Sequence, residues 1–257
     1  MDITLVSLVA LVASGLTLFS GFGLGTLLMP IVALFFPVEL AIAMTAMVHF
    51  ANNLFKVALV GRHTNRQVLL RFGLPAIAAA FLGAWLLGTL ATTAPITEVW
   101  LWGAKRQIKL LELIVGGLIL VFVVLELTPW WSKKSFDRRY LPLGGAISGF
   151  FGGLSGHQGA FRSMFLIKAG LSKEQFIGTG VMLAVLVDLA RLLVYGTTTL
   201  IVTQGIDWAL VSAATLSAFA GAYAGTRLVK KVTLRSVQFI VSAFLALIAM
   251  AMMAGIL

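Results

Sequence analysis

Cysteine is missing from this sequence of 257 residues, and charged side chains are scarce. The first absence excludes disulfides, thiolate nucleophiles and cysteine metal sites. Charged residues make up 11% of the chain, less than half of the roughly 25% that keeps a soluble domain hydrated. There is no HExxH pattern, and pairing Ser155 with His157 gives no plausible catalytic arrangement. We therefore expect no enzyme, no metal site and no cofactor.

Hydrophobic residues fill 60% of the chain, and the mean hydropathy is +1.03. At ~20 apolar residues per crossing, the length allows about six to nine membrane spans and leaves no room for a separate soluble domain. The first 30 residues are apolar but lack a basic leading segment, which favours a first span over a cleaved signal peptide. The sequence predicts an all-α polytopic protein of the lipid bilayer.

Six apolar runs are each about long enough to cross a bilayer. They cover residues 39–61, 68–91, 107–128, 174–197, 208–226 and 236–257. Two more apolar segments, 3–37 and 141–171, are interrupted by clustered glycines, which let the backbone turn. We expect each of these to form a helical hairpin that enters the membrane and returns to the same side, surrounded by protein or a watery cavity.

The chain repeats itself. Asn53 aligns with Asp188, and Lys56 aligns with Arg191 at the same separation. Each half then consists of one glycine-broken hairpin plus three transmembrane helices, and because three is odd the second half must be inverted. The predicted organisation is a first repeat over residues 1–128, a cytoplasmic linker over 129–139 and an inverted second repeat over 140–257.

The net charge of +10 is better explained by membrane topology than by nucleic acid, which we do not expect as a partner. With the N-terminus outside, most loop lysines and arginines fall on the cytoplasmic side. The outside segments then carry only Lys105, Arg106 and Lys109. We predict a multi-pass protein of the bacterial inner membrane with both termini outside.

Polar side chains share one face of the span 39–61. His49, Asn52, Asn53 and Lys56 are spaced i, i+3, i+4 and i+7, which places them together on a helix. They either bond across helices while Lys56 extends to the membrane interface, or they line a binding site.

The equivalent span carries Asp188 and Arg191 at i and i+3. These two residues form a local ion pair, face an aqueous path, or do both, because charges inside membranes usually face a bundle interior.

The second hairpin carries His157, Gln158 and Arg162 beside flexible backbone. Together with free backbone N–H groups they could form an anion site; alternatively, Arg162 bonds the exposed carbonyls of the hairpin. The first hairpin has no such side chains, so Gly23 and Gly25 could bind a ligand only through the backbone. Small-residue pairs such as Gly21/Gly25 and Gly221/Gly225 indicate close helix packing rather than a dinucleotide site.

The glycine motifs of both halves resemble those of the sulfite exporter TauE/SafE family. They read GFGLGTLLMP at residues 21–30, GGLSGHQG at 152–159 and GLSKEQ at 170–175. The resemblance covers nearly the whole chain and implies a bacterial transporter of small sulfur-containing anions, with the site between two inverted halves. The second motif is usually rich in glycine and proline, whereas here it carries His157, Gln158 and Arg162.

The hypothesis is a secondary transporter, most simply an exporter, of sulfite or an organosulfonate such as sulfoacetate. Positive charge would come from Arg162, Arg191 and Lys56, hydrogen bonds from His157, Gln158, Asn52 and Asn53, and proton coupling from Asp188 and His49. Buried cations outnumber the one deep acid, which favours an anion over a metal cation. An anion channel and a non-transporting membrane scaffold or enzyme subunit remain alternatives, and the oligomeric state is left open.

Overall fold

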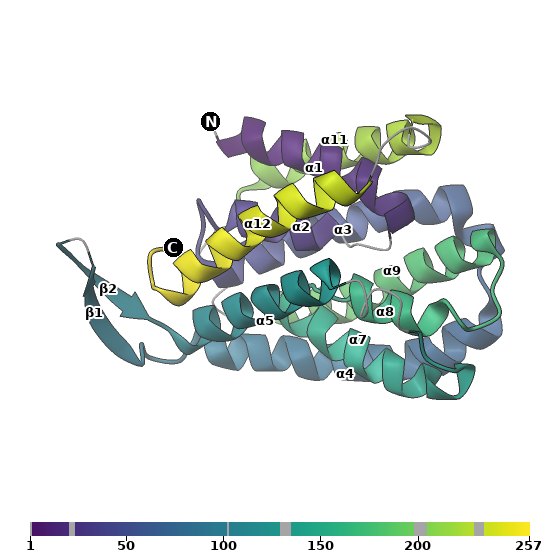
Figure 1. The fold of residues 1–257 in the computed structure, drawn as a ribbon, viewed down its shortest axis with the longest axis horizontal. Helices are drawn as coiled ribbons and strands as arrows, with labels where there is room; N and C mark the ends of the chain where they lie inside the picture. Colours follow the sequence, from purple (N-terminus) through teal and green to yellow (C-terminus); the bar gives the residue numbers. More distant parts are fainter. Residues whose placement is uncertain (1, 21–23, 102, 129–134, 198–204, 229–233) are drawn as a thin grey trace.

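A computed structural model describes residues 2–20, 24–101, 103–128, 135–197, 205–228 and 234–257 of the chain (Figure 1). It is mostly helical, at 80%. The first half contains α1 (Asp2–Ser20), α2 (Leu24–Val32), α3 (Val38–Val60), the 3₁₀ turn η1 (Gly61–His63), α4 (Arg66–Ala91), β1 (Thr97–Leu101), β2 (Ala104–Ile108) and α5 (Leu110–Leu127). The second half contains the 3₁₀ turn η2 (Arg138–Tyr140), α7 (Leu141–Ser155), α8 (Gly159–Leu166), α9 (Lys173–Thr197), α11 (Trp208–Leu228) and α12 (Leu234–Met253).

All six predicted apolar runs form helices. Among the described residues, α3, α4, α9 and α11 are long and apolar enough to cross a membrane, and α1, α5 and α12 contain shorter apolar stretches. The outer face of α4 is apolar and suited to contact with lipid. Its large hydrophobic side chains that are more than half exposed are Leu70, Leu74, Leu82 and Trp85. An apolar outside around a polar inside is the arrangement expected of helices in a bilayer.

The ends of two helices follow from local hydrogen bonds. The side chain of Asn65 caps α4 by accepting from the backbone N–H of Val68 at 3.1 Å. Ser172 and Gln175 form a reciprocal capping box at the start of α9, with both bonds at 3.2 Å. Such boxes satisfy backbone N–H groups that have no partner within the helix. The GLSKEQ stretch therefore has a structural role as the cap of α9.

The prediction of an all-α chain departs from the structure at one place in the described residues. Strands β1 and β2 form an antiparallel hairpin, with Thr97 opposite Ile108 and Leu101 opposite Ala104. Residues 107–108, which we assigned to an apolar run, belong to β2. The hairpin forms because Gly103 takes a φ of 77° at the turn, a conformation that glycine adopts without strain.

Helix α4 packs against α7, and α1 packs against α11, with their backbones in contact. The two helices of each pair run parallel to one another. Every fourth residue of α7 is a glycine whose Cα lies against the α4 backbone, so that an added Cβ would collide with it. The contacts are Gly145 with Phe72, Gly149 with Ala76 and Gly153 with Ala80. Small residues at this spacing let helix backbones approach closely in membranes.

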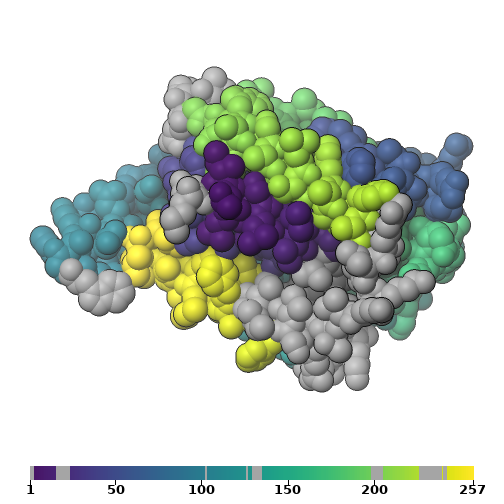
Figure 2. All heavy atoms as spheres, turned by 90° about the horizontal axis from the view of Figure 1, so that it is seen from above, coloured from purple at the N-terminus to yellow at the C-terminus, as the bar shows by residue number. Residues whose placement is uncertain are grey.

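The second close pair is α1 with α11. Gly221 lies against the backbone of Leu11, and Gly225 lies against that of Gly15. The prediction that Gly221 and Gly225 mark close packing is thus confirmed, whereas Gly21 lies outside the described residues. Figure 2 shows α1, in purple, lying along light-green α11 on one face of the molecule.

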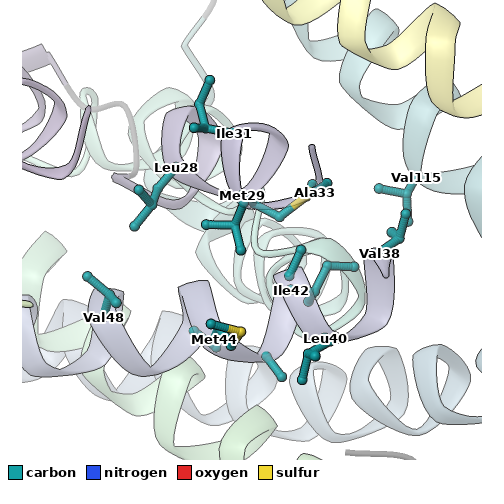
Figure 3. Packing of buried hydrophobic residues seen from close by; sticks show 14 of the residues in the cluster. Leu28, Met29, Ile31, Ala33, Val38, Leu40, Ile42, Met44, Val48 and Val115 are labelled. Carbon is teal, nitrogen blue, oxygen red and sulfur yellow. The ribbon is translucent and has the colours of Figure 1, made fainter. Parts of the chain in front are cut away.

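Both glycine-rich segments are broken into a longer and a shorter helix, α1 with α2 and α7 with α8. The chain turns after α7 at Gly156, whose φ of 82° disfavours a residue with a Cβ. The short α2 packs against α1, α3 and α12. Figure 3 shows Leu28, Met29 and Ile31 of α2 over Ile42 and Met44 of α3. The short helix α2 thus lies inside the bundle, where irregular backbone is tolerated.

The N-terminal end of α1, the C-terminus and the β-hairpin lie at the same end of the helical body (Figure 1). Gly255 lies against the backbone of Gln107 in β2. The first helix therefore begins, and the last helix ends, at the same end of the body as the segment that we assigned to the outside.

Candidate functional site

The polar face of α3 is turned into the protein. His49, Asn52, Asn53 and Lys56 are each at most 5% exposed. At 4% exposure Lys56 does not extend to the interface, which was the alternative for this residue. Four buried polar side chains on consecutive turns need partners, because an unpaired polar group away from water is costly.

Asp188, on the facing helix α9, is the hub of these contacts and is 0% exposed. The Nδ1–H of His49 donates to its Oδ2 at 2.6 Å. The amide of Asn53 donates to the same oxygen at 3.4 Å. The amide of Gln158, from the second hairpin, donates to Oδ1 at 3.5 Å. One carboxylate thus connects α3, α9 and the turn that precedes α8.

Arg191 is the fourth donor to Asp188. Its Nε and Nη2 donate to Oδ1 at 3.0 and 2.7 Å. The local ion pair that the i, i+3 spacing allowed is therefore present, and it lies in a place where Arg191 is 1% exposed. Asp188 balances the charge of Arg191, which leaves less of that charge for a ligand than an unpaired guanidinium would offer.

The second hairpin brings its polar side chains to the same region but leaves some of their atoms without partners. His157 donates from Nδ1 to the carbonyl of Ser155 at 3.0 Å and stacks on Phe122 of α5, with ring centroids 5.1 Å apart. Among the described residues, three buried atoms of this hairpin have no hydrogen-bond partner: His157 Nε2, Gln158 Oε1 and Arg162 Nη1. Such atoms are rare in folded proteins and are expected where a ligand or water binds.

Positive charge exceeds negative charge in this buried region. Arg162 is 9% exposed, and it and Lys56 repel one another electrostatically. Asp188, the deep acid of α9, already pairs with Arg191. In the part of the chain that the structure describes, no three His, Asp or Glu side chains are placed to hold a metal ion. An anion would lower the energy of this arrangement, and a cation would raise it.

The two broken helices meet beside the cluster. A Cβ placed on Gly25, at the start of α2, would lie 3.7 Å from the carbonyl oxygen of Gly156, at the end of α7. The same position is 4.0 Å from the ring of His49. Gly25 therefore lies close to the polar cluster, and Gly23 lies outside the described residues.

Sequence reasoning missed three residues that hold the cluster in place. The hydroxyl of Tyr195 donates to the carbonyl of Gly153 at 2.5 Å. Ser148 donates to the carbonyl of Gln158 at 3.0 Å. Ser14 donates to the side chain of Asn52 at 3.1 Å. Tyr195 was recognisable, because it follows Asp188 by seven positions, the same i, i+7 spacing that singled out Lys56.

The family model for the sulfite exporter TauE/SafE family matches residues 6–252. The chain belongs to this family. The match includes both broken helices and every residue of the buried cluster. TauE/SafE is a family of membrane transporters, and the apolar helices of this chain agree with a multi-pass membrane protein. A comparison with curated proteins gives no match.

Proposed function

We propose that this TauE/SafE protein is a secondary transporter that exports a small sulfur oxyanion, sulfite or an organosulfonate, across the bacterial inner membrane. The observation that carries the proposal is the buried Nη1 of Arg162, which has no hydrogen-bond partner among the described residues. It lies within electrostatic range of Lys56, in a region where Lys56, Arg162 and Arg191 outnumber Asp188. Burying such charge costs about 2.5–3.5 kcal/mol per residue on the membrane-insertion scale. A bound oxyanion offsets that cost.

The residues divide into those that contact the anion and those that act through Asp188. Arg162 and Lys56 supply charge to the anion, and Gln158, His157 and Asn52 supply hydrogen bonds at its edge. Arg191 acts through Asp188, which it holds in place beside His49. Asp188 and His49 share one short hydrogen bond, so a proton that arrives at this pair changes the charge next to the anion, and this is the proposed route of proton coupling.

Two contacts support an inverted repeat with halves at 1–128 and 140–257. Asn53 and Asp188 align in the sequence and bond to one another at 3.4 Å, as residues near a two-fold axis must. Gly83 begins the stretch GAW in the first half, and Gly221 begins the similar stretch GAY in the second half. Each of these glycines lies against the backbone of the first long helix of the other half, Gly83 against α7 and Gly221 against α1.

Because helices of one repeat pack against helices of the other, the two moving bodies of the proposed transporter are not the two repeats. We call the two close helix contacts, α4–α7 and α1–α11, seams. Each seam joins helices of different repeats at backbone contact, so rocking one sequence repeat against the other would break both seams. In the proposed alternating access, one moving body contains α4 and α7, and the other contains α1 and α11. The anion site lies between them, where α3 crosses α9.

The proposed orientation has both termini outside and the 129–139 linker in the cytoplasm. A reporter tag after Leu257 is then accessible to an impermeant label in intact cells, and a tag placed within 135–139 is not. Equal labelling of the two tags contradicts the inverted arrangement.

Arg162→Ala tests the anion site. Sulfite, and a panel of sulfate, thiosulfate, sulfoacetate and phosphate, is titrated against the purified protein while thermal unfolding is followed. A ligand at 100 times its Kd stabilises by about 2.7 kcal/mol. We expect sulfite to raise the Tm of the wild type and to bind Arg162→Ala about 10–100-fold more weakly, because a charged hydrogen bond is lost.

The matched control is Arg71→Ala, which removes an exposed arginine from α4 and should leave the anion response unchanged. A wild type that no anion stabilises, or an Arg162→Ala variant that responds like Arg71→Ala, contradicts the proposed site.

A further inference from the structure

The amide of Gln158 has a fixed orientation. Its Nε2 donates to Oδ1 of Asp188, and a carboxylate accepts hydrogen bonds but does not donate them. The amide nitrogen must therefore face Asp188. Its Oε1, which only accepts, is left buried without a partner among the described residues, on a side chain that is 1% exposed.

Arg162 lies one helical turn beyond Gln158, and its backbone N–H donates to the carbonyl of Gln158 at 3.0 Å. Residues at i and i+4 share a helix face, with Cβ atoms ~5–6 Å apart. Both side chains are turned toward α9: Gln158 contacts Asp188, and a Cβ placed on Gly180 would lie 3.7 Å from Arg162 Nε. One face of this turn thus presents an acceptor and a cationic donor that are both unpaired within the described part of the chain.

A ligand that satisfies both atoms must accept from Arg162 and donate to Gln158. Sulfate, thiosulfate and the sulfite dianion only accept, and so would leave the Gln158 oxygen unpaired. In sulfoacetate the atom attached to sulfur is a carbon, which is no effective donor. Hydrogen sulfite, in the form that carries an O–H on sulfur, offers oxygen acceptors and a donor within one small anion.

We propose that the anion site selects sulfur oxyanions that carry a hydrogen-bond donor on an atom bonded to sulfur, an inference that rests on the proposed function. Gln158 Oε1 is the acceptor that binds this donor. The transported form of sulfite is then hydrogen sulfite. A site built to pair with a ligand O–H or N–H rejects the analogue without it, because its own buried acceptor loses a partner.

Sulfamate and methanesulfonate form a matched pair of probes. Both are monoanions at neutral pH with one –SO₃⁻ group, and they differ in carrying an NH₂ or a CH₃ on sulfur. Titration of each against the purified full chain, followed by thermal unfolding, gives two Kd values. We expect sulfamate to bind the wild type about tenfold more tightly than methanesulfonate, and this ratio to fall toward one in Gln158→Met.

Gln67→Met is the control, because Gln67 is exposed and its amide oxygen accepts from Arg138 at the surface; it should keep the tenfold ratio. Equal affinities of the wild type for the two probes overturn the inference, as does a ratio that Gln158→Met leaves unchanged. If Gln158→Met does not fold, the wild-type ratio alone decides. Failure of sulfite and both probes to bind refutes the proposed function instead, so the two failures are distinguishable.

Discussion

Asp188→Ala is expected to lower the free energy of unfolding by about 3–5 kcal/mol, the cost of leaving a buried charge without its partner. Arg191 is 1% exposed and makes two hydrogen bonds to this carboxylate. The amides of Asn53 and Gln158 and the ring of His49 lose an acceptor at the same time. Chemical unfolding of the purified protein in mild detergent measures the change.

Glu98→Ala is the matched control. It also removes the acid of an ion pair, with Lys105, but the two side chains are 42% and 56% exposed. Surface pairs contribute about 0–1 kcal/mol, so this variant should unfold almost like the wild type. The double variant Asp188→Ala/Arg191→Met should recover part of the lost stability, because no unpaired buried cation remains. Similar stability of Asp188→Ala and Glu98→Ala would contradict the role of Asp188 as the hub.

Gly149→Ala is expected to destabilise the protein by about 3 kcal/mol or more, the upper end of the cost of overpacking. The added Cβ would lie under 3.0 Å from three backbone atoms of Ala76. Backbone cannot rotate away as a side chain does, so α4 and α7 must separate along the whole seam. We expect a lower Tm and a smaller yield of monodisperse protein.

Gly117→Ala provides the same change without the contact. Gly117 also lies in an apolar helix, α5, but a Cβ there would meet nothing within 4 Å among the described residues. Alanine favours helix over glycine by up to about 1 kcal/mol, so this variant should be as stable as the wild type or slightly more so. A Gly149→Ala protein that unfolds like Gly117→Ala would show that the seam is looser than the structure has it.

Sequence periodicity was sufficient to locate the helices and the polar faces. The i, i+3, i+4, i+7 spacing brought His49, Asn53 and Lys56 together, and all three are buried. Spacing could not show which helix each face meets. That Asp188 binds His49 depends on α3 crossing α9, which is decided by the packing of the whole bundle rather than by either helix alone.

The close seams illustrate the same limit. Glycine pairs indicated tight packing, but nothing local to Gly149 identifies α4 as its partner. The β-hairpin was missed for a different reason. Residues 97–108 are a short, largely polar and aromatic stretch next to long apolar runs, and such a stretch is too short and too polar to be recognised as a membrane span. The turn signal available in the sequence was Gly103, which takes a positive φ in the structure.

The sequence also could not show which polar atoms of the site have no hydrogen-bond partner among the described residues. His157, Gln158 and Arg162 were equally good ligand candidates there, yet they differ in the structure. The ring of His157 packs on Phe122, whereas Gln158 and Arg162 face α9. Only the hydrogen bond from Gln158 to Asp188 reveals which atom of its amide is left over.

The central claim, that this buried cluster carries a sulfur oxyanion across the membrane, is tested most directly by sulfite flux into proteoliposomes. We predict uptake that saturates with sulfite concentration, responds to an imposed pH gradient, and falls at least tenfold in Arg162→Ala while Arg71→Ala behaves like the wild type. Sulfite uptake no faster than in protein-free liposomes, or equal uptake by Arg162→Ala and Arg71→Ala, would contradict it.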